Sequence, residues 1–250
     1  MCRCARYRAT LAYDGTAYHG FQRQANASPT IQGVVEEGLA RISGERVHVI
    51  GAGRTDAGVH ATGQVIAFDL DWRHSADDLR NALNANLPAD VAVWSVEETT
   101  PDFHPRYDAR RRTYVYELYV APVRNPLRRW RAWHLHTELD VDMIRAAAAS
   151  LIGEHDFSTF GVPPQGESAV RHVFEANWET DGSGEHRFTI TANAFLFRMV
   201  RSIVGTLVLV GQGRMTGDDF RGILAARDRS LAGAAAPAHG LTLVRVDYND

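Results

Sequence analysis

The order of periodic segments along the chain constrains its fold more than any other feature of the sequence. Residues 6–13 alternate, with Tyr7 and Leu11 on one face, which is the period of a half-buried strand. Two amphipathic segments begin at Thr30 and Ser75, residue types that cap helices. Helices are predicted after these caps, and strands at residues 6–13, 47–50, 64–70 and 91–96. The predicted order is therefore strand, helix, strand, strand, helix, strand.

The second part of the chain repeats this order, although no repeat of individual residues is visible. Its predicted strands are 113–120, 170–179, 187–193 and 241–248, and its predicted helices are 141–152, 195–210 and a shorter one that begins at Thr216. The turn residues at 181–184, Asp-Gly-Ser-Gly, predict a hairpin. Two successive series predict an α+β fold of two ferredoxin-like βαββαβ units, whose antiparallel sheets form a central cleft. We expect the two halves to be residues 1–104 and 105–250.

The composition excludes several classes of protein. A chain of 250 residues, 45% hydrophobic and 23% charged, can bury a large core, so neither wholesale disorder nor a disulfide scaffold is expected. Cys2 and Cys4 are too few for a structural zinc site, and we interpret them as free thiols. The longest apolar stretch, 203–210, is about half the length of a membrane-spanning helix. Because the N-terminal residues also lack the apolar core of a secretory signal, we expect a cytoplasmic protein.

Positive charge is concentrated in one segment. The net charge is −3, and all 27 basic residues are arginine. Eight of these arginines lie in residues 106–131, interleaved with tyrosines and Trp130, against only Asp108 and Glu117. Such a surface can bind phosphates and stack bases, which favours nucleic acid as a partner. A solvated basic face or a dimer contact explains the same pattern equally well.

A glycine-rich loop at residues 51–58 carries Arg54 and Asp56. A dinucleotide-binding fingerprint is disfavoured here, because Asp56 occupies the place of its third glycine and the residues after the loop alternate as a strand. One hypothesis is a structural turn in which Asp56 binds nearby main-chain amides. The other is an ionised carboxylate, held by a counter-charge, that acts as a nucleophile or a base.

The same loop resembles the active-site motif of a known family. Residues 51–61, GAGRTDAGVHA, are similar to that motif in the TruA-type tRNA pseudouridine synthases. Six further stretches resemble the family in order along the chain: 13–24, 30–33, 112–116, 153–158, 199–205 and 240–241. One departure is Ser202, where many members carry Asn after the arginine.

The resemblance implies a fold, a reaction and partners. Members have a duplicated ferredoxin-like fold, act as homodimers without a cofactor or metal, and isomerise uridine to pseudouridine at positions 38, 39 and 40 of the tRNA anticodon stem-loop. The N-terminal half would then carry the catalytic loop, and the C-terminal half the RNA-binding strand and dimer contacts. Neither a membrane nor a nucleotide cofactor is expected as a partner.

The resemblance also implies roles for individual residues. Asp56 would carry the chemistry, either by attacking or by abstracting a proton, with Arg54 and Arg201 as candidates for its ion pairing. Tyr114 would stack on the flipped uracil. The remaining substrate-binding candidates are Phe21, Arg110, Arg111, Arg112 and Leu241.

Other functions fit the sequence less well. His134, His136 and His155 lack a third ligand at metal spacing, so structural roles are expected for them. The signatures of serine hydrolases and zinc deaminases are absent from the sequence. The competing hypothesis is a non-catalytic RNA-binding module on the same fold. Asp56 argues against it, because a carboxylate in a pure binding surface would repel phosphates.

Overall fold

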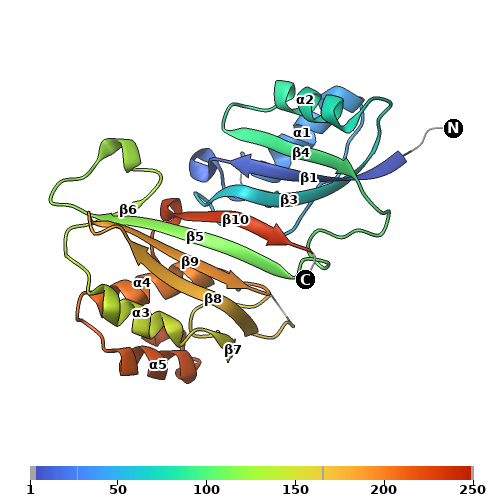
Figure 1. Cartoon of the computed structure of the whole chain (residues 1–250). Helices are drawn as coiled ribbons and strands as arrows, with labels where there is room; N and C mark the ends of the chain where they lie inside the picture. The colour runs from blue at the N-terminus through green and yellow to red at the C-terminus, as the bar shows by residue number, and fades with distance from the viewer. Residues whose placement is uncertain (1–3, 27, 165, 249–250) are drawn as a thin grey trace. The chain divides into compact units, whose positions relative to one another are not determined.

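The chain folds into two compact α+β units. The structure, a computed structural model, describes residues 4–26, 28–164 and 166–248. The first unit comprises Met1–Arg110 together with Leu243–Asp250, and the second comprises Arg111–Thr242 (Figure 1). Most of the last strand of the chain therefore belongs to the first unit. No helix in the described part of the chain is long and apolar enough to cross a membrane.

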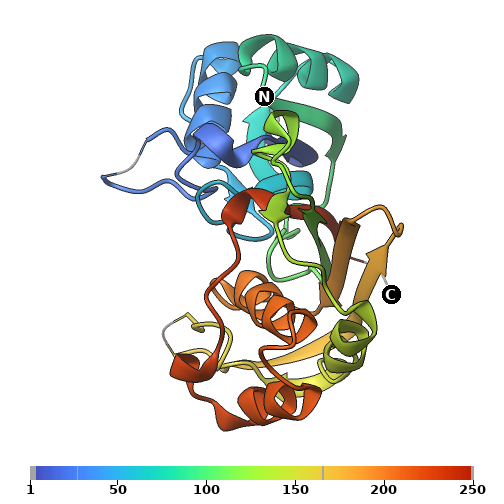
Figure 2. The ribbon, with the colours of Figure 1, turned by 90° about the vertical axis from the view of Figure 1, so that its left-hand side faces the viewer.

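The first unit contains the predicted order of elements. These are β1 (Cys4–Tyr13), α1 (Ile31–Ser43), β2 (Ile50–Gly51), β3 (His60–Asp71), α2 (Ala76–Asn86) and β4 (Val91–Glu98), with a short 3-10 helix η1 (Gly15–Ala17) after β1. β1 pairs antiparallel with both β3 and β4, and β2 pairs antiparallel with β3. Both helices lie side by side on one face of these strands (Figures 1 and 2).

Local sequence signals account for the helix ends in this unit. Thr30 Oγ1 accepts a hydrogen bond from the Gly33 amide, and α1 ends at Gly44, whose φ of 77° is left-handed. Ser75 and Asp78 form a reciprocal capping box at the start of α2. The caps predicted at Thr30 and Ser75 are confirmed.

The strand predicted at 47–50 is shorter than expected. Only Ile50 and Gly51 pair with β3. The Val49 amide donates to the Glu36 carboxylate, and the Val49 carbonyl accepts from Gln32 Nε2. Side chains of α1 therefore occupy the main-chain groups that a longer strand would need.

The second unit is a mixed sheet covered by helices. Its elements are β5 (Arg111–Val120), β6 (Trp133–Leu135), α3 (Val141–Ala149), β7 (Gly153–Asp156), β8 (Val170–Thr180), β9 (Glu185–Ala192), α4 (Met199–Gly211) and α5 (Gly217–Ala226). Three 3-10 helices join them, η2 (Pro126–Arg128), η3 (Arg229–Leu231) and η4 (Ala238–Gly240), before β10 (Leu241–Asp247). The order β5-β9-β8-β7 is antiparallel, whereas β6 runs parallel to β5. The expectation of purely antiparallel sheets is therefore wrong for this unit.

Helix α4 begins later than predicted. The apolar run from Phe195 continues a helical pattern, but Arg198 has a left-handed φ of 63° and Phe197 forms an isolated bridge with Val162. The helix starts at Met199 for this reason. By contrast, the predicted start of α5 at Thr216 is confirmed, where Thr216 and Asp219 form a reciprocal capping box, and so is the hairpin between β8 and β9.

Candidate functional site

The loop between β2 and β3 that carries Arg54 and Asp56 is fastened to β3. The Ala52 amide donates to the Val65 carbonyl over 2.8 Å, and Gln64 Nε2 donates to the Gly53 carbonyl over 2.8 Å. The Val59 amide closes the turn on the Asp56 carbonyl at 3.1 Å. The main chain on both sides of Asp56 is therefore fixed.

The segment after β1 packs against this loop through its main chain. The Phe21 amide donates to the Thr55 carbonyl over 3.0 Å. A Cβ atom at Gly15 would lie 2.0 Å from the Val59 carbonyl oxygen, and one at Gly20 would lie 2.6 Å from that of Thr55. Gly20 also has a φ of 89°. Glycine is required at both positions, and two of the stretches that resemble the family, 13–24 and 51–61, meet here.

Buried polar side chains lie behind the loop. The Tyr13 hydroxyl and Thr55 Oγ1 are 2.8 Å apart, and Thr55 and Gln64 are 7% and 0% exposed. Burial raises the pKa of Tyr13 to about 12, and its hydrogen bond with Thr55 opposes that rise in part. Sequence reasoning missed these residues. The available signal was a polar hydroxyl on Tyr13 at the end of β1 and a polar side chain, Gln64, among the apolar residues of β3.

The predicted site residues of the first unit differ in exposure. Asp56 is half-buried and Arg54 is exposed, and no ion pair of Arg54 occurs among the described residues. Phe21 is 3% exposed, with its ring against Gly51, where a Cβ would lie 2.4 Å from the ring. Arg110 is exposed, and its amide donates to the Asp247 carbonyl. Phe21 thus contacts Gly51 at the start of the loop with its buried ring and Thr55 with its amide.

The predicted residues on β5 alternate between the surface and the interior. Tyr114 is 8% exposed and meets the Phe195 ring edge-on, with centroids 5.0 Å apart. Arg112 is also buried, and it donates to the Asn193 carbonyl over 2.7 Å. Arg111 is exposed, with its guanidinium 4.5 Å from the centre of the Phe174 ring. Of these two arginines, only Arg111 is placed on the surface.

Arg201 is held by the segment that leads to β10. Its Nε donates to the Ala236 carbonyl, and its own carbonyl accepts from the Ala236 amide. The Tyr116 hydroxyl donates to Pro237, and a Cβ at Gly240 would lie 2.6 Å from the Tyr116 ring. Burial raises the pKa of Tyr116, and the charge of Arg201 opposes the rise. The stretches 112–116, 199–205 and 240–241 therefore meet around residues 236–240. The predicted substrate contact Leu241 is itself buried.

Part of the basic segment is engaged within the second unit. Arg128 pairs with Glu185 and lies 4.9 Å over the Tyr119 ring, so it anchors the loop between β5 and β6. That loop exposes Leu127 and Trp130, with Arg129 stacked on Trp130 at 5.5 Å. The loop thus presents apolar and cationic groups together.

His134, one of the three histidines considered above, packs against β5. His134 stacks on Tyr119 with centroids 4.9 Å apart, and its Nε2 lies 2.8 Å from the Ala121 carbonyl. In the described ranges, no group of three or more His, Cys, Asp or Glu side chains is arranged to hold a metal.

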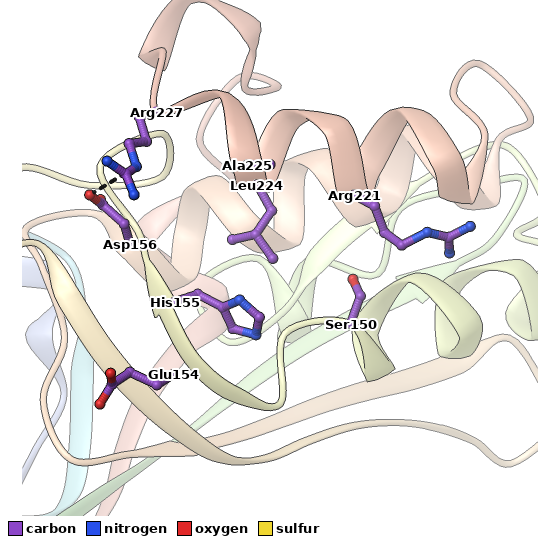
Figure 3. Close-up of a pocket in the computed structure, with 8 residues that line it drawn as sticks. All are labelled: Ser150, Glu154, His155, Asp156, Arg221, Leu224, Ala225 and Arg227. Atoms are coloured by element: carbon purple, nitrogen blue, oxygen red, sulfur yellow. Dashed lines mark ion pairs between the residues drawn. The ribbon is translucent and has the colours of Figure 1, made fainter.

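A cavity of about 470 Å³ lies elsewhere in the second unit, between β7 and α5 (Figure 3). Its lining residues are Ser150, Glu154, His155, Asp156, Arg221, Leu224, Ala225 and Arg227. Asp156 lies 3.3 Å from Arg227 and accepts hydrogen bonds from the Ser158 amide and hydroxyl. The Ser158 bonds hold the pKa of Asp156 below its usual range, with help from Arg227. None of the predicted site residues lines this cavity.

Known proteins resemble this chain over nearly its whole length. It is 44% identical over 244 residues to tRNA pseudouridine synthase A of Neisseria gonorrhoeae, covering 97% of this chain and 92% of that protein. It is 43% identical over 248 residues to tRNA pseudouridine synthase A of Streptococcus mutans, and the match covers 98% of this chain and 99% of that protein.

A chain in the crystal structure of a Cbf5-Nop10-Gar1 complex overlays with a TM-score of 0.43 at 13% identity, covering 95% of this chain and 48% of that one. That likeness is too weak to establish a common fold. A family profile described as tRNA pseudouridine synthase matches residues 9–108 and 147–249. The resemblance seen in the sequence is confirmed, and the chain belongs to the TruA-type tRNA pseudouridine synthase family, whose members are isomerases.

Proposed function

We propose that this isomerase converts uridine to pseudouridine at positions 38, 39 and 40 of the tRNA anticodon stem-loop, with Asp56 as the catalytic carboxylate. The observation that carries the proposal is the Asp56 loop, in which a half-buried carboxylate lies on a main chain fixed on both sides. A pure RNA-binding surface has no use for a carboxylate held in this way, because it repels phosphates.

The reaction is an isomerisation without a redox change. The bond between N1 of uracil and C1′ of the ribose breaks, the detached base rotates, and a new bond forms between C5 and C1′. The proton on C5 is lost and N1 gains a proton. Asp56 can serve this sequence either by attacking the nucleotide or by removing a proton, since both roles need an ionised carboxylate.

Other residues would hold the nucleotide and the tRNA. The face of Tyr114 would stack on the flipped uracil, and Arg201 and Arg54 would act on the charge of Asp56 or of nearby phosphates. Arg110 and Arg111 are exposed and suited to phosphate contacts. Arg112 is buried, so its contribution would be to hold β5 against Asn193. Leu241 and Phe21 would shape the site from within their units.

The proposal includes the larger architecture implied by the family. Two ferredoxin-like units would form the RNA-binding cleft, and two copies of the chain would form a homodimer. The βαββαβ order of the first unit supports the ferredoxin-like architecture. Sedimentation equilibrium of the purified protein tests the homodimer, for which a mass near twice 27.7 kDa is expected.

The test of the function is mass spectrometry of anticodon-arm fragments after incubation of unmodified tRNA with the protein and treatment with a carbodiimide. The label stays attached to pseudouridine but not to uridine, and it is needed because the two isomers have the same mass. We expect pseudouridine at positions 38 to 40 with the wild type and none with Asp56→Asn, which keeps shape and removes the ionised oxygen. Asp71→Asn changes an exposed carboxylate of the same unit and is the matched control. Modification at other positions, or near-normal turnover of Asp56→Asn, would overturn the proposal.

A further inference from the structure

We propose that Tyr13, Thr55 and Gln64 are positioning residues that hold the Asp56 loop in its reactive geometry. The inference rests on the proposed catalytic role of Asp56. The three side chains come from β1, the loop and β3, and none of them is among the residues that the resemblance assigns to the site.

Thr55 is the direct link to Asp56, since it is the preceding residue. Its Oγ1 lies 2.8 Å from the Tyr13 hydroxyl, and its carbonyl accepts from the Phe21 amide at 3.0 Å. The side chain and the carbonyl of Thr55 are therefore both held by groups outside the loop. Since the peptide between Thr55 and Asp56 is planar, this limits the movement of the Asp56 main chain.

Gln64 fixes the loop on the other side of Arg54. Its Nε2 donates to the Gly53 carbonyl over 2.8 Å, and its side chain is fully buried. Tyr13 and Gln64 therefore hold the loop at two points, Thr55 and Gly53, on either side of Arg54. A movement of the loop away from β3 would break hydrogen bonds at Gly53 and Thr55 together.

These contacts are better explained by the exact position that catalysis requires of Asp56 than by the stability of the fold. Replacing both partners of a buried hydrogen bond with apolar groups of similar shape is often nearly neutral for folding. A misplacement of about 1 Å at a reacting group, in contrast, can lower turnover about a hundredfold. Burial raises the pKa of Tyr13 from 10.0 to about 12, so its hydroxyl keeps the proton in mildly alkaline as well as neutral solution and the hydrogen bond with Thr55 persists there.

The test measures kcat, KM and the melting temperature of matched variants. Tyr13→Phe and Thr55→Val remove the hydroxyls and keep the shapes, whereas Thr55→Ser keeps the hydroxyl. We expect kcat to fall about tenfold in Tyr13→Phe and Thr55→Val, with KM within about twofold of the wild type. Thr55→Ser should retain most of kcat, and the double variant should be little worse than either single one, because both lose the same bond.

The control is Tyr248→Phe, which removes a hydroxyl that donates to the Pro105 carbonyl in the same unit. It should keep its kcat. The inference is overturned if Thr55→Ser is as impaired as Thr55→Val, or if the loss of kcat follows the loss of melting temperature across all variants. Asp56→Asn separates the two proposals. An active Asp56→Asn would refute the proposed function. An inactive Asp56→Asn together with fully active Tyr13→Phe and Thr55→Val would refute only the positioning role.

Discussion

The two units hold their candidate functional residues by different means. In the first unit, Asp56 lies on an irregular loop that main-chain hydrogen bonds and close glycine contacts fix in place. In the second, Tyr114 lies on a strand and Arg201 on a helix, where packing and the regular main chain hold them. An irregular loop needs particular residues at many positions, whereas a regular element needs few. The loop is therefore conspicuous in a single sequence, and Tyr114 and Arg201 resemble ordinary core or surface residues.

Among changes outside Asp56 itself, the largest effect should come from a methyl group placed against the loop. We expect Gly20→Ala to lower turnover about a hundredfold, because its Cβ would lie 2.6 Å from the Thr55 carbonyl and its φ is 89°. Gly44→Ala is the control, since Gly44 also has a positive φ but nothing within 4 Å of its Cβ position. It should cost about 1 kcal/mol of stability without loss of turnover. Comparable turnover in both variants would show that close glycine contacts do not hold the Asp56 loop of the first unit.

In the second unit, loss of packing should matter more than loss of a polar group. Tyr114→Ala removes a buried ring that contacts Phe195, and we expect turnover to fall at least tenfold. Tyr114→Phe keeps the ring face and should keep much of the activity. The measurement is tritium release from 5-tritiated tRNA, together with the melting temperature of each variant. Equal and severe losses would instead assign a role to the hydroxyl.

The exposed arginines should change the salt dependence of tRNA binding. We expect Arg110→Gln with Arg111→Gln to lower the slope of log K against log salt by up to about 1.8, because each phosphate contact contributes about 0.7 to 0.9. The matched control is Arg46→Gln with Arg73→Gln, which removes the same charge from exposed positions of the first unit. Filter binding across a salt series measures both. Identical slopes in the two double variants would place the RNA path elsewhere.

A smaller effect is expected at the turn beside the cavity of the second unit. Ser158→Ala removes a hydrogen bond that lowers the pKa of Asp156. A carboxyl with a lowered folded-state pKa stabilises the fold above its unfolded pKa, and this contribution is lost as the pH falls through the folded pKa. Ser158→Ala should therefore cost about 1 kcal/mol at pH 7, and the difference from the wild type should shrink below about pH 4. Urea unfolding at several pH values measures this, and a constant difference would contradict it.

The smallest effect should be a gain in stability. Gly222 lies inside α5, with nothing within 4 Å of a Cβ built there. Gly222→Ala should raise the unfolding free energy by about 0.5–1 kcal/mol, because alanine loses less main-chain freedom than glycine in a helix. Turnover should not change. A destabilised variant would show that this helix is more constrained than its surroundings suggest.

Periodicity and caps were sufficient to predict most elements of both units, including β1, β3 and the starts of α1, α2 and α5. They were insufficient for β6 and β7, which have three and four residues and are too short to show a period. The start of α4 was missed because the left-handed Arg198 interrupts an apolar run without a glycine or proline to mark it.

The candidate site was predictable to a similar degree. Glycines next to a charged pair marked the Asp56 loop, but the roles assigned to the site residues stay predictions. The contacts of Tyr13 with Thr55 and of Arg201 with Ala236 join residues 42 and 35 positions apart. No local pattern indicates such pairs, because they depend on how the strands and helices pack.

The return of the chain to its first unit has a consequence for synthesis. Leu243–Asp250 belong to the unit that Met1–Arg110 begin, and a Cβ at Gly63 of β3 would lie 2.2 Å from the Val244 carbonyl. On the ribosome, the part of the chain that carries Asp56 emerges early, yet it waits for the whole of Arg111–Thr242 before its last strand exists. Until then β3 lacks its pairing with β10, and a strand edge without its partner is the state in which a nascent chain is most open to wrong pairing. The unit made last thus controls when the unit made first can finish folding.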